Sequence, residues 1–152
     1  DLYNHIYNSY VLRVAFLLQF SVVPLCLTSK IDTFEKVVKW SALSVLVFIL
    51  FAKINSPQWI LWVSPFLILL ARDRKYILGI IALDLITYLQ YPIIFNLYLD
   101  GQISLNLLLL VYGLRIILLV MFAVHIFFEV IGDNYIYTKI KNPQSSKLQE
   151  SR

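Results

Sequence analysis

Residues 53–62, Lys-Ile-Asn-Ser-Pro-Gln-Trp-Ile-Leu-Trp, hold the side chains best suited to bind an anion. Ser56 is favourable just before a helix and Pro57 suits the first helical position, so the sequence predicts a helix start here. The free N–H groups and the positive dipole end of a helix start attract phosphate. Lys53 and Gln58 add an ammonium and an amide donor at the same level. These residues predict a site for a phosphate or diphosphate.

A simpler interpretation of the same residues stays open. Ser-Pro is a common helix start, and Trp59 and Trp62 fit the aromatic belt at a membrane surface. Lys53 then extends its ammonium to the lipid headgroups. Arg13 has the same two interpretations, because its guanidinium either extends to the headgroups or binds the phosphate through paired hydrogen bonds.

The composition points to a membrane protein. The chain has 152 residues, 60% hydrophobic and 14% charged, with a mean hydropathy of +0.76. Soluble domains are about 45–50% apolar and about 25% charged, and short chains bury the smaller share of their surface. A soluble domain and a disordered chain are therefore both disfavoured. With one cysteine and two histidines, the sequence identifies no metal site and no cofactor, and it leaves a divalent cation open.

Five apolar stretches predict an all-α, polytopic membrane bundle within residues 1–132, since a transmembrane helix needs about 20 mostly apolar residues. The connections are short, so successive helices should lie side by side in antiparallel order. Residues 133–152 are polar and predict a cytoplasmic tail that is disordered or lies on the membrane surface. The five spans lie near residues 10–27, 37–54, 57–71, 76–99 and 104–131.

The distribution of basic residues predicts the orientation. Ten of the 13 Lys and Arg residues fall on one side when five spans alternate, and the positive-inside rule places that side in the cytoplasm. The N-terminus is then outside or lumenal, in a plasma membrane or an endoplasmic-reticulum-like membrane. Span 57–71 rises about 22 Å across a hydrocarbon core of about 30 Å, so its outward start is expected below the outer surface. Membrane lipid is the expected partner, and nothing indicates nucleic acid.

Residues 53–62, together with Pro65, resemble a late-helix signature of GT-C-type membrane glycosyltransferases. The likeness is to the polyprenyl-phosphate-sugar users, which include GPI mannosyltransferase I and its prokaryotic relatives, and about 15 residues carry it. The resemblance implies transfer of mannose or another hexose from a polyprenyl-phosphate donor at the non-cytoplasmic face. It implies these site residues: Lys53, Ser56 and Gln58 at the donor phosphate, and Trp59 and Trp62 against the sugar or prenyl chain. Arg13 lies outside the signature and joins the phosphate-binding residues only through the chemistry of its guanidinium.

The same family places its general base in the first outward loop of the full protein. Asp1 and Asp100 are the only outward acidic residues here, and neither matches that motif. The resemblance therefore implies the C-terminal part of an enzyme, with its catalytic residues unknown and the missing N-terminal part as a partner. A chain that begins with Asp1 agrees with a piece of a longer protein.

Charged residues within the predicted spans form two further candidate pairs. Asp84 lies about 13 Å from the cytoplasmic side and Arg115 about 17 Å from the outer side, so across a core of about 30 Å their depths nearly coincide. We expect them to form an ion pair, either as a structural contact or as part of a proton or substrate path. His125 and Glu129, four residues apart, share one helix face and should form a structural contact.

Two other functions remain as alternatives. In the first, the chain is a non-catalytic polytopic subunit that packs against partners. In the second, it is a fragment of a transporter or flippase whose path is lined by Asp84 and Arg115. The transporter ranks last, because the sequence lacks a pair of broken helices at matching positions.

Overall fold

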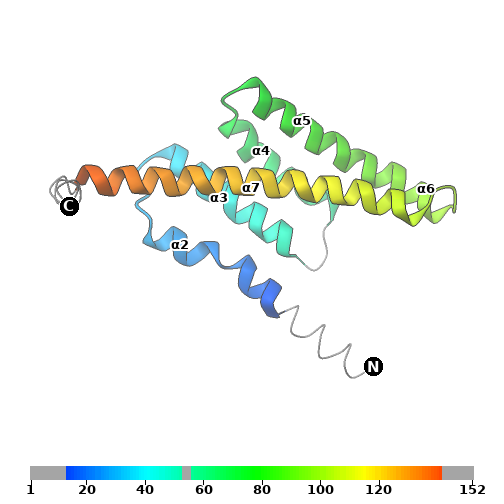
Figure 1. Ribbon diagram of the computed structural model, residues 1–152, viewed down its shortest axis with the longest axis horizontal. Helices are drawn as coiled ribbons and strands as arrows, with labels where there is room; N and C mark the ends of the chain where they lie inside the picture. The colour runs from blue at the N-terminus through cyan, green and yellow to red at the C-terminus, as the bar shows by residue number, and fades with distance from the viewer. Residues whose placement is uncertain (1–12, 53–55, 142–152) are drawn as a thin grey trace, which may run out of the picture.

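The computed structural model describes residues 13–52 and 56–141, with side chains up to residue 132. Its described part is helical and contains no strand (Figure 1), so the expected all-α class is confirmed. The elements are α2 (Val22–Thr28), α3 (Phe34–Phe51), the 3-10 turn η1 (Pro57–Trp59), α4 (Ile60–Leu70), α5 (Arg74–Tyr88), the wide-turn segment η2 (Leu89–Ile94), α6 (Phe95–Leu99) and α7 (Leu105–Lys141).

Capping residues set the helix starts. Thr33 accepts a hydrogen bond from the Lys36 N–H at 3.3 Å, so α3 begins three residues before the predicted span. Asp73 caps α5 in the same way, through the Tyr76 N–H at 2.7 Å. Ser56 and Pro57 occupy the expected positions at the start of η1, but the Ser56 hydroxyl makes no capping hydrogen bond.

Prolines explain two interruptions of the helices. Pro24 has no N–H to donate to the carbonyl of Phe20, and its ring displaces that carbonyl, so the helical residues before α2 end in a turn at 20–21. Tyr91 has an extended backbone, with φ −143 and ψ 121, because the ring of Pro92 disfavours helical backbone at the residue before it. The helix therefore kinks at Pro92, whereas α4 continues through Pro65.

α3 is the central helix of the bundle. It packs against α2, α4 and α7. In the opposite part of the fold, α5 packs against α7. Figure 1 shows α7 running along the length of the molecule, with α5 and α6 beside it. The core lies where these helices meet, and it includes the fully buried side chains of Leu46 and Ile49 on α3, Leu67 on α4 and Leu119 on α7.

Two helical segments of the described chain are long and apolar enough to cross a membrane. They are Arg74–Leu99, with 26 residues, and Leu105–Gly132, with 28. The apolar segments Arg13–Thr28 and Pro57–Leu70 are shorter, and α3 carries charged residues in its first two turns. More large hydrophobic side chains are exposed than buried, which matches a lipid-facing exterior better than a water-facing one.

The last helix is longer than the sequence indicates. α7 continues to Lys141, so residues 133–141 of the expected tail have helical backbone. A helix already nucleated by a long apolar stretch extends at one hydrogen bond per residue, which explains why α7 continues into these polar residues. Whether they lie on a membrane surface stays a prediction. Residues 142–152 of the expected tail lie outside the described residues.

Candidate functional site

A buried arginine joins three segments of the fold. Arg115 on α7 has no exposed surface, although its side chain carries a full positive charge. Its Nη1 donates to Gln90 Oε1 at 3.3 Å, and its Nη2 donates to the carbonyl oxygen of Ser56 at 3.2 Å. Its Nε is buried and has no hydrogen-bond partner among the described residues. We call the corner formed by Arg115, Gln90 and Ser56 the Arg115 corner.

The charge of the Arg115 corner is not balanced within the described chain. Both acceptors of the guanidinium are neutral, and no described carboxylate pairs with it. A buried charge without an opposite charge costs several kcal/mol, and an arginine inside a membrane is costly as well. An anion placed beside Arg115 would therefore be strongly stabilised, and a phosphate suits the geometry of a guanidinium.

The start of the Pro57–Leu70 helix lies at this corner, which is well along α7 from the N-terminal end of that helix. Arg115 is ten residues from the first residue of α7, which is about 15 Å along the helix axis. Arginine side chains lean toward the N-terminal end of their helix, so the Ser56 carbonyl lies on the order of 10–15 Å below that end. The depth of this helix start below a membrane surface stays a prediction.

The other residues expected at the donor phosphate lie in different places in the structure. Ser56 is half-buried at the corner, and Gln58 is exposed. Arg13 is exposed on the helical segment that precedes α2. Lys53 lies outside the described residues.

The two tryptophans expected at the sugar or prenyl chain form a pair. The rings of Trp59 and Trp62 stack with centroids 5.8 Å apart and an interplanar angle of 15°. Phe48 on α3 packs against Trp59 at 5.6 Å, and Trp62 remains 55% exposed. One flat aromatic surface is thus fixed one turn beyond the start of the Pro57–Leu70 helix, where a sugar ring or an apolar chain has a surface to pack on.

The expected ion pair between Asp84 and Arg115 is wrong. Asp84 is exposed and accepts a hydrogen bond from the Ser64 hydroxyl at 3.1 Å, whereas Arg115 bonds to Gln90 and Ser56. The depths were counted from opposite ends of a 30 Å core, but the 26 residues of Arg74–Leu99 span about 39 Å if wholly helical. The difference of about 9 Å equals six residues, which is the separation between Asp84 and Gln90.

The sequence analysis did not identify Gln90 as a partner of Arg115. Gln90 is 9% exposed in η2, immediately before the kink at Tyr91. A signal existed, because a polar amide in an apolar stretch has to find a hydrogen-bond partner, and Gln90 lies about as far from the 100–104 turn as Arg115 does. Counting both positions from that shared turn would have matched them.

A cluster of charged side chains lies at the opposite end of the bundle. Lys39 on α3 is buried, and its Nζ lies 2.9 Å from Glu35 and 3.1 Å from Glu129 on α7. Arg72 contacts the same two glutamates. His125 Nε2 lies 3.5 Å from Glu129 Oε1, so the expected contact between these two residues is confirmed. Here, unlike at the Arg115 corner, buried charge is balanced by opposite charge.

Neither a metal centre nor a family assignment emerges from the described chain. Among the described side chains, no group of three or more His, Cys, Asp or Glu is placed to hold a metal ion. Comparison with protein-family models, with curated proteins and with solved structures finds no match for the chain. The functional argument therefore depends on the geometry of the Arg115 corner.

Proposed function

We propose that this chain is a helical membrane module of a glycosyltransferase that takes mannose or another hexose from a polyprenyl-phosphate donor at the non-cytoplasmic face. In this proposal the donor phosphate binds at the Arg115 corner. The observation that carries it is the buried Arg115 guanidinium, whose described partners, Gln90 Oε1 and the Ser56 carbonyl, are both neutral. A lipid-linked phosphate reaches a recessed site from within the bilayer, whereas a soluble phosphate would have to leave water.

The chain's other features give the donor a consistent arrangement. The Pro57–Leu70 helix starts beside Arg115, and its positive dipole end adds to the attraction for phosphate. The stacked rings of Trp59 and Trp62 supply an apolar surface for the sugar or the prenyl chain. Arg13 and Lys53 are proposed to approach the phosphate from the outward segments. The catalytic base is proposed to lie in the part of the enzyme that precedes this chain.

The test replaces Arg115 in the full-length protein and measures binding of a polyprenyl monophosphate in lipid nanodiscs. Arg115→Met keeps most of the side-chain volume and removes the charge, so the fold should persist while phosphate binding is lost. Hydrogen bonds to charged groups contribute about 1.5–3 kcal/mol, so affinity should fall roughly tenfold to a hundredfold. Glycosyl transfer should fall with it.

A matched control removes a different arginine. Arg74 is exposed at the start of α5, so Arg74→Gln should leave polyprenyl phosphate binding unchanged. Size-exclusion profiles confirm that both variants are folded. Wild-type affinity in a folded Arg115→Met variant would overturn the phosphate site.

A second role, packing against another membrane protein, is favoured by Asp84. This carboxylate is exposed on α5 between the exposed apolar side chains of Ile81 and Leu85. A carboxylate facing lipid is costly, so a membrane-embedded Asp84 needs covering by protein or a wet cavity. As a non-catalytic subunit, the chain would lose its partner on Asp84→Leu substitution and would bind no polyprenyl phosphate.

A further inference from the structure

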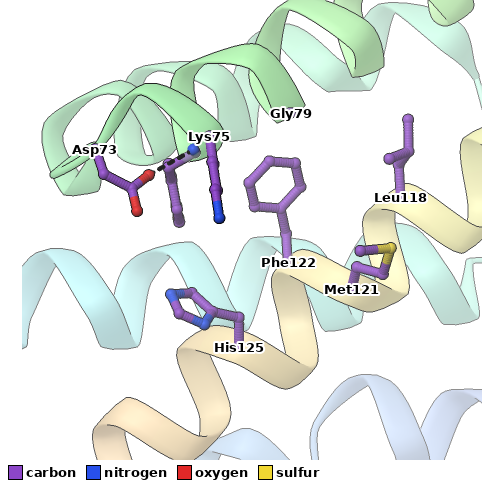
Figure 2. A pocket seen from close by; sticks show the side chains of 8 residues that line it. Asp73, Lys75, Gly79, Leu118, Met121, Phe122 and His125 are labelled. Carbon is purple, nitrogen blue, oxygen red and sulfur yellow. Dashed lines mark hydrogen bonds between the residues drawn. The ribbon is translucent and has the colours of Figure 1, made fainter.

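A cavity of about 290 Å³ opens between α5 and α7, at the end of the bundle that carries the charged cluster. Asp73 and Lys75 from the start of α5 and His125 from α7 lie at its mouth (Figure 2). Tyr76 also lines the cavity, with a buried hydroxyl that has no hydrogen-bond partner among the described residues. Asp73 uses Oδ1 to accept the Tyr76 N–H, which leaves its other carboxylate oxygen for a ligand. His125 is turned toward Glu129. Lys75 and Asp73 therefore present one positive and one negative charge, two residues apart.

The inner part of the cavity is apolar. Leu118 and Met121 line it from α7 and Gly79 lines it from α5, with Phe122 between the mouth and this inner part (Figure 2). Gly79 has no side chain, and a Cβ there would meet the Phe122 ring at 3.1 Å. From His125 to Leu118 the cavity follows seven residues of α7, about 10 Å along the helix.

We propose that this cavity binds a phospholipid with an amine in its headgroup, of the phosphatidylethanolamine type. The phosphate contacts the Lys75 ammonium, the headgroup ammonium contacts the Asp73 carboxylate, and one acyl chain lies along Gly79, Leu118 and Met121. Two features select this ligand. The mouth carries both charges of a zwitterionic headgroup, and the apolar part continues along the helices as an acyl chain would in a bilayer. The proposal requires the Arg74–Leu99 segment and α7 to cross the membrane, and it does not involve the Arg115 corner.

The experiment measures binding of palmitoyl-oleoyl phosphatidylethanolamine and phosphatidylglycerol to the full-length protein by native mass spectrometry after delipidation. Wild-type protein should retain one phosphatidylethanolamine more tightly than phosphatidylglycerol. Lys75→Gln should weaken both lipids about tenfold, since it removes a direct hydrogen bond between a charged side chain that lines the cavity and the phosphate. Asp73→Asn, which keeps the helix cap, should weaken phosphatidylethanolamine alone by a similar factor.

Matched controls lie beside each variant. Arg74→Gln removes a neighbouring charge that does not line the cavity and should change neither affinity. Met121→Trp should fill the cavity and exclude the lipid, whereas Val120→Trp, on an exposed face of α7 outside the cavity, should not. All five variants should bind polyprenyl phosphate normally, which separates this site from the proposed donor site.

Two results would overturn the proposal. Equal retention of the two lipids by wild-type protein would remove the headgroup recognition. Loss of lipid in Met121→Trp alone, with no effect of Lys75→Gln or Asp73→Asn, would show a cavity that accepts any acyl chain or detergent tail.

Discussion

The Nη2 of Arg115 donates to the Ser56 carbonyl oxygen at 3.2 Å, which fixes the start of the Pro57–Leu70 helix to the first third of α7. A backbone carbonyl is a neutral acceptor, and so is the Gln90 side chain that binds the same guanidinium at 3.3 Å. The contact therefore satisfies hydrogen bonds without balancing the charge. This separation of hydrogen bonding from charge balance makes the Arg115 corner testable by single substitutions.

Gln90→Glu would supply the missing charge from within the chain. A carboxylate at the position of Gln90 Oε1 would pair with the Arg115 guanidinium, so the variant without ligand should unfold at a higher temperature than wild type. The same carboxylate would compete with a lipid phosphate, so polyprenyl phosphate affinity should fall at least tenfold. Thermal unfolding and lipid binding in nanodiscs measure the two effects.

Gln90→Leu separates charge from hydrogen bonding. It removes the acceptor without adding a carboxylate, so stability should fall by about 1–3 kcal/mol because one donor of Arg115 is left unpaired. Higher stability in Gln90→Glu together with unchanged phosphate affinity would show that no phosphate uses this corner.

Local signals made much of the fold predictable from the sequence. Ser56 and Pro57 predict a helix start within four residues. Pro92 indicates a kink, because its ring disfavours helical backbone at the preceding residue. The contact of His125 with Glu129 follows from helical spacing alone. Each of these features depends on residues that are near in sequence, so each could be stated without knowing how the helices pack.

Contacts between distant segments were not predictable in the same way. The partner of Arg115 depends on how long the Arg74–Leu99 segment is relative to α7. Assuming a fixed membrane thickness underestimated that length, and so placed Asp84 instead of Gln90 at the level of Arg115. The pairing of Lys39 with Glu129 requires α3 to pack against α7, and the polar residues at the helix ends do not specify that pair. The role of Lys53 remains a prediction.

Lys39 should contribute more to stability than Lys36, a lysine three residues earlier whose side chain is less deeply buried, at 16% exposed. Its side chain is 3% exposed and pairs with Glu35 and Glu129, so Lys39→Met leaves these two carboxylates with reduced compensation. Unfolding free energy should fall by about 2–4 kcal/mol, less than for a fully buried pair because Glu35 is half-exposed. Lys36→Met, which removes the i,i+4 pair with Asp32, should cost under about 1 kcal/mol. Similar losses in the two variants would contradict a distinct role for the buried lysine.

The exposed face of α7 tests whether this helix crosses a bilayer. Ile117 is 57% exposed near the centre of Leu105–Gly132, and Leu105 is 50% exposed at its first residue. A lysine at a bilayer centre costs about 2.5–3.5 kcal/mol, whereas a lysine at a helix end extends to the headgroups. Ile117→Lys should therefore destabilise the protein in lipid nanodiscs by about 2–3 kcal/mol more than Leu105→Lys. Negligible effects of both changes on thermal unfolding would contradict a transmembrane α7.

Two glycines should respond to the same substitution with opposite signs. A Cβ at Gly79 would meet the Phe122 ring at 3.1 Å, and that ring packs against Tyr76 in a T-shaped arrangement at a centroid distance of 5.1 Å. Gly79→Ala should therefore lower the unfolding free energy by about 1–2 kcal/mol through overpacking. A Cβ at Gly113 meets nothing within 4 Å, so Gly113→Ala should raise it by about 0.5–1 kcal/mol through helix propensity. Thermal unfolding of both variants under one condition compares the signs, and a gain in both would show that α5 and α7 approach less closely at Gly79.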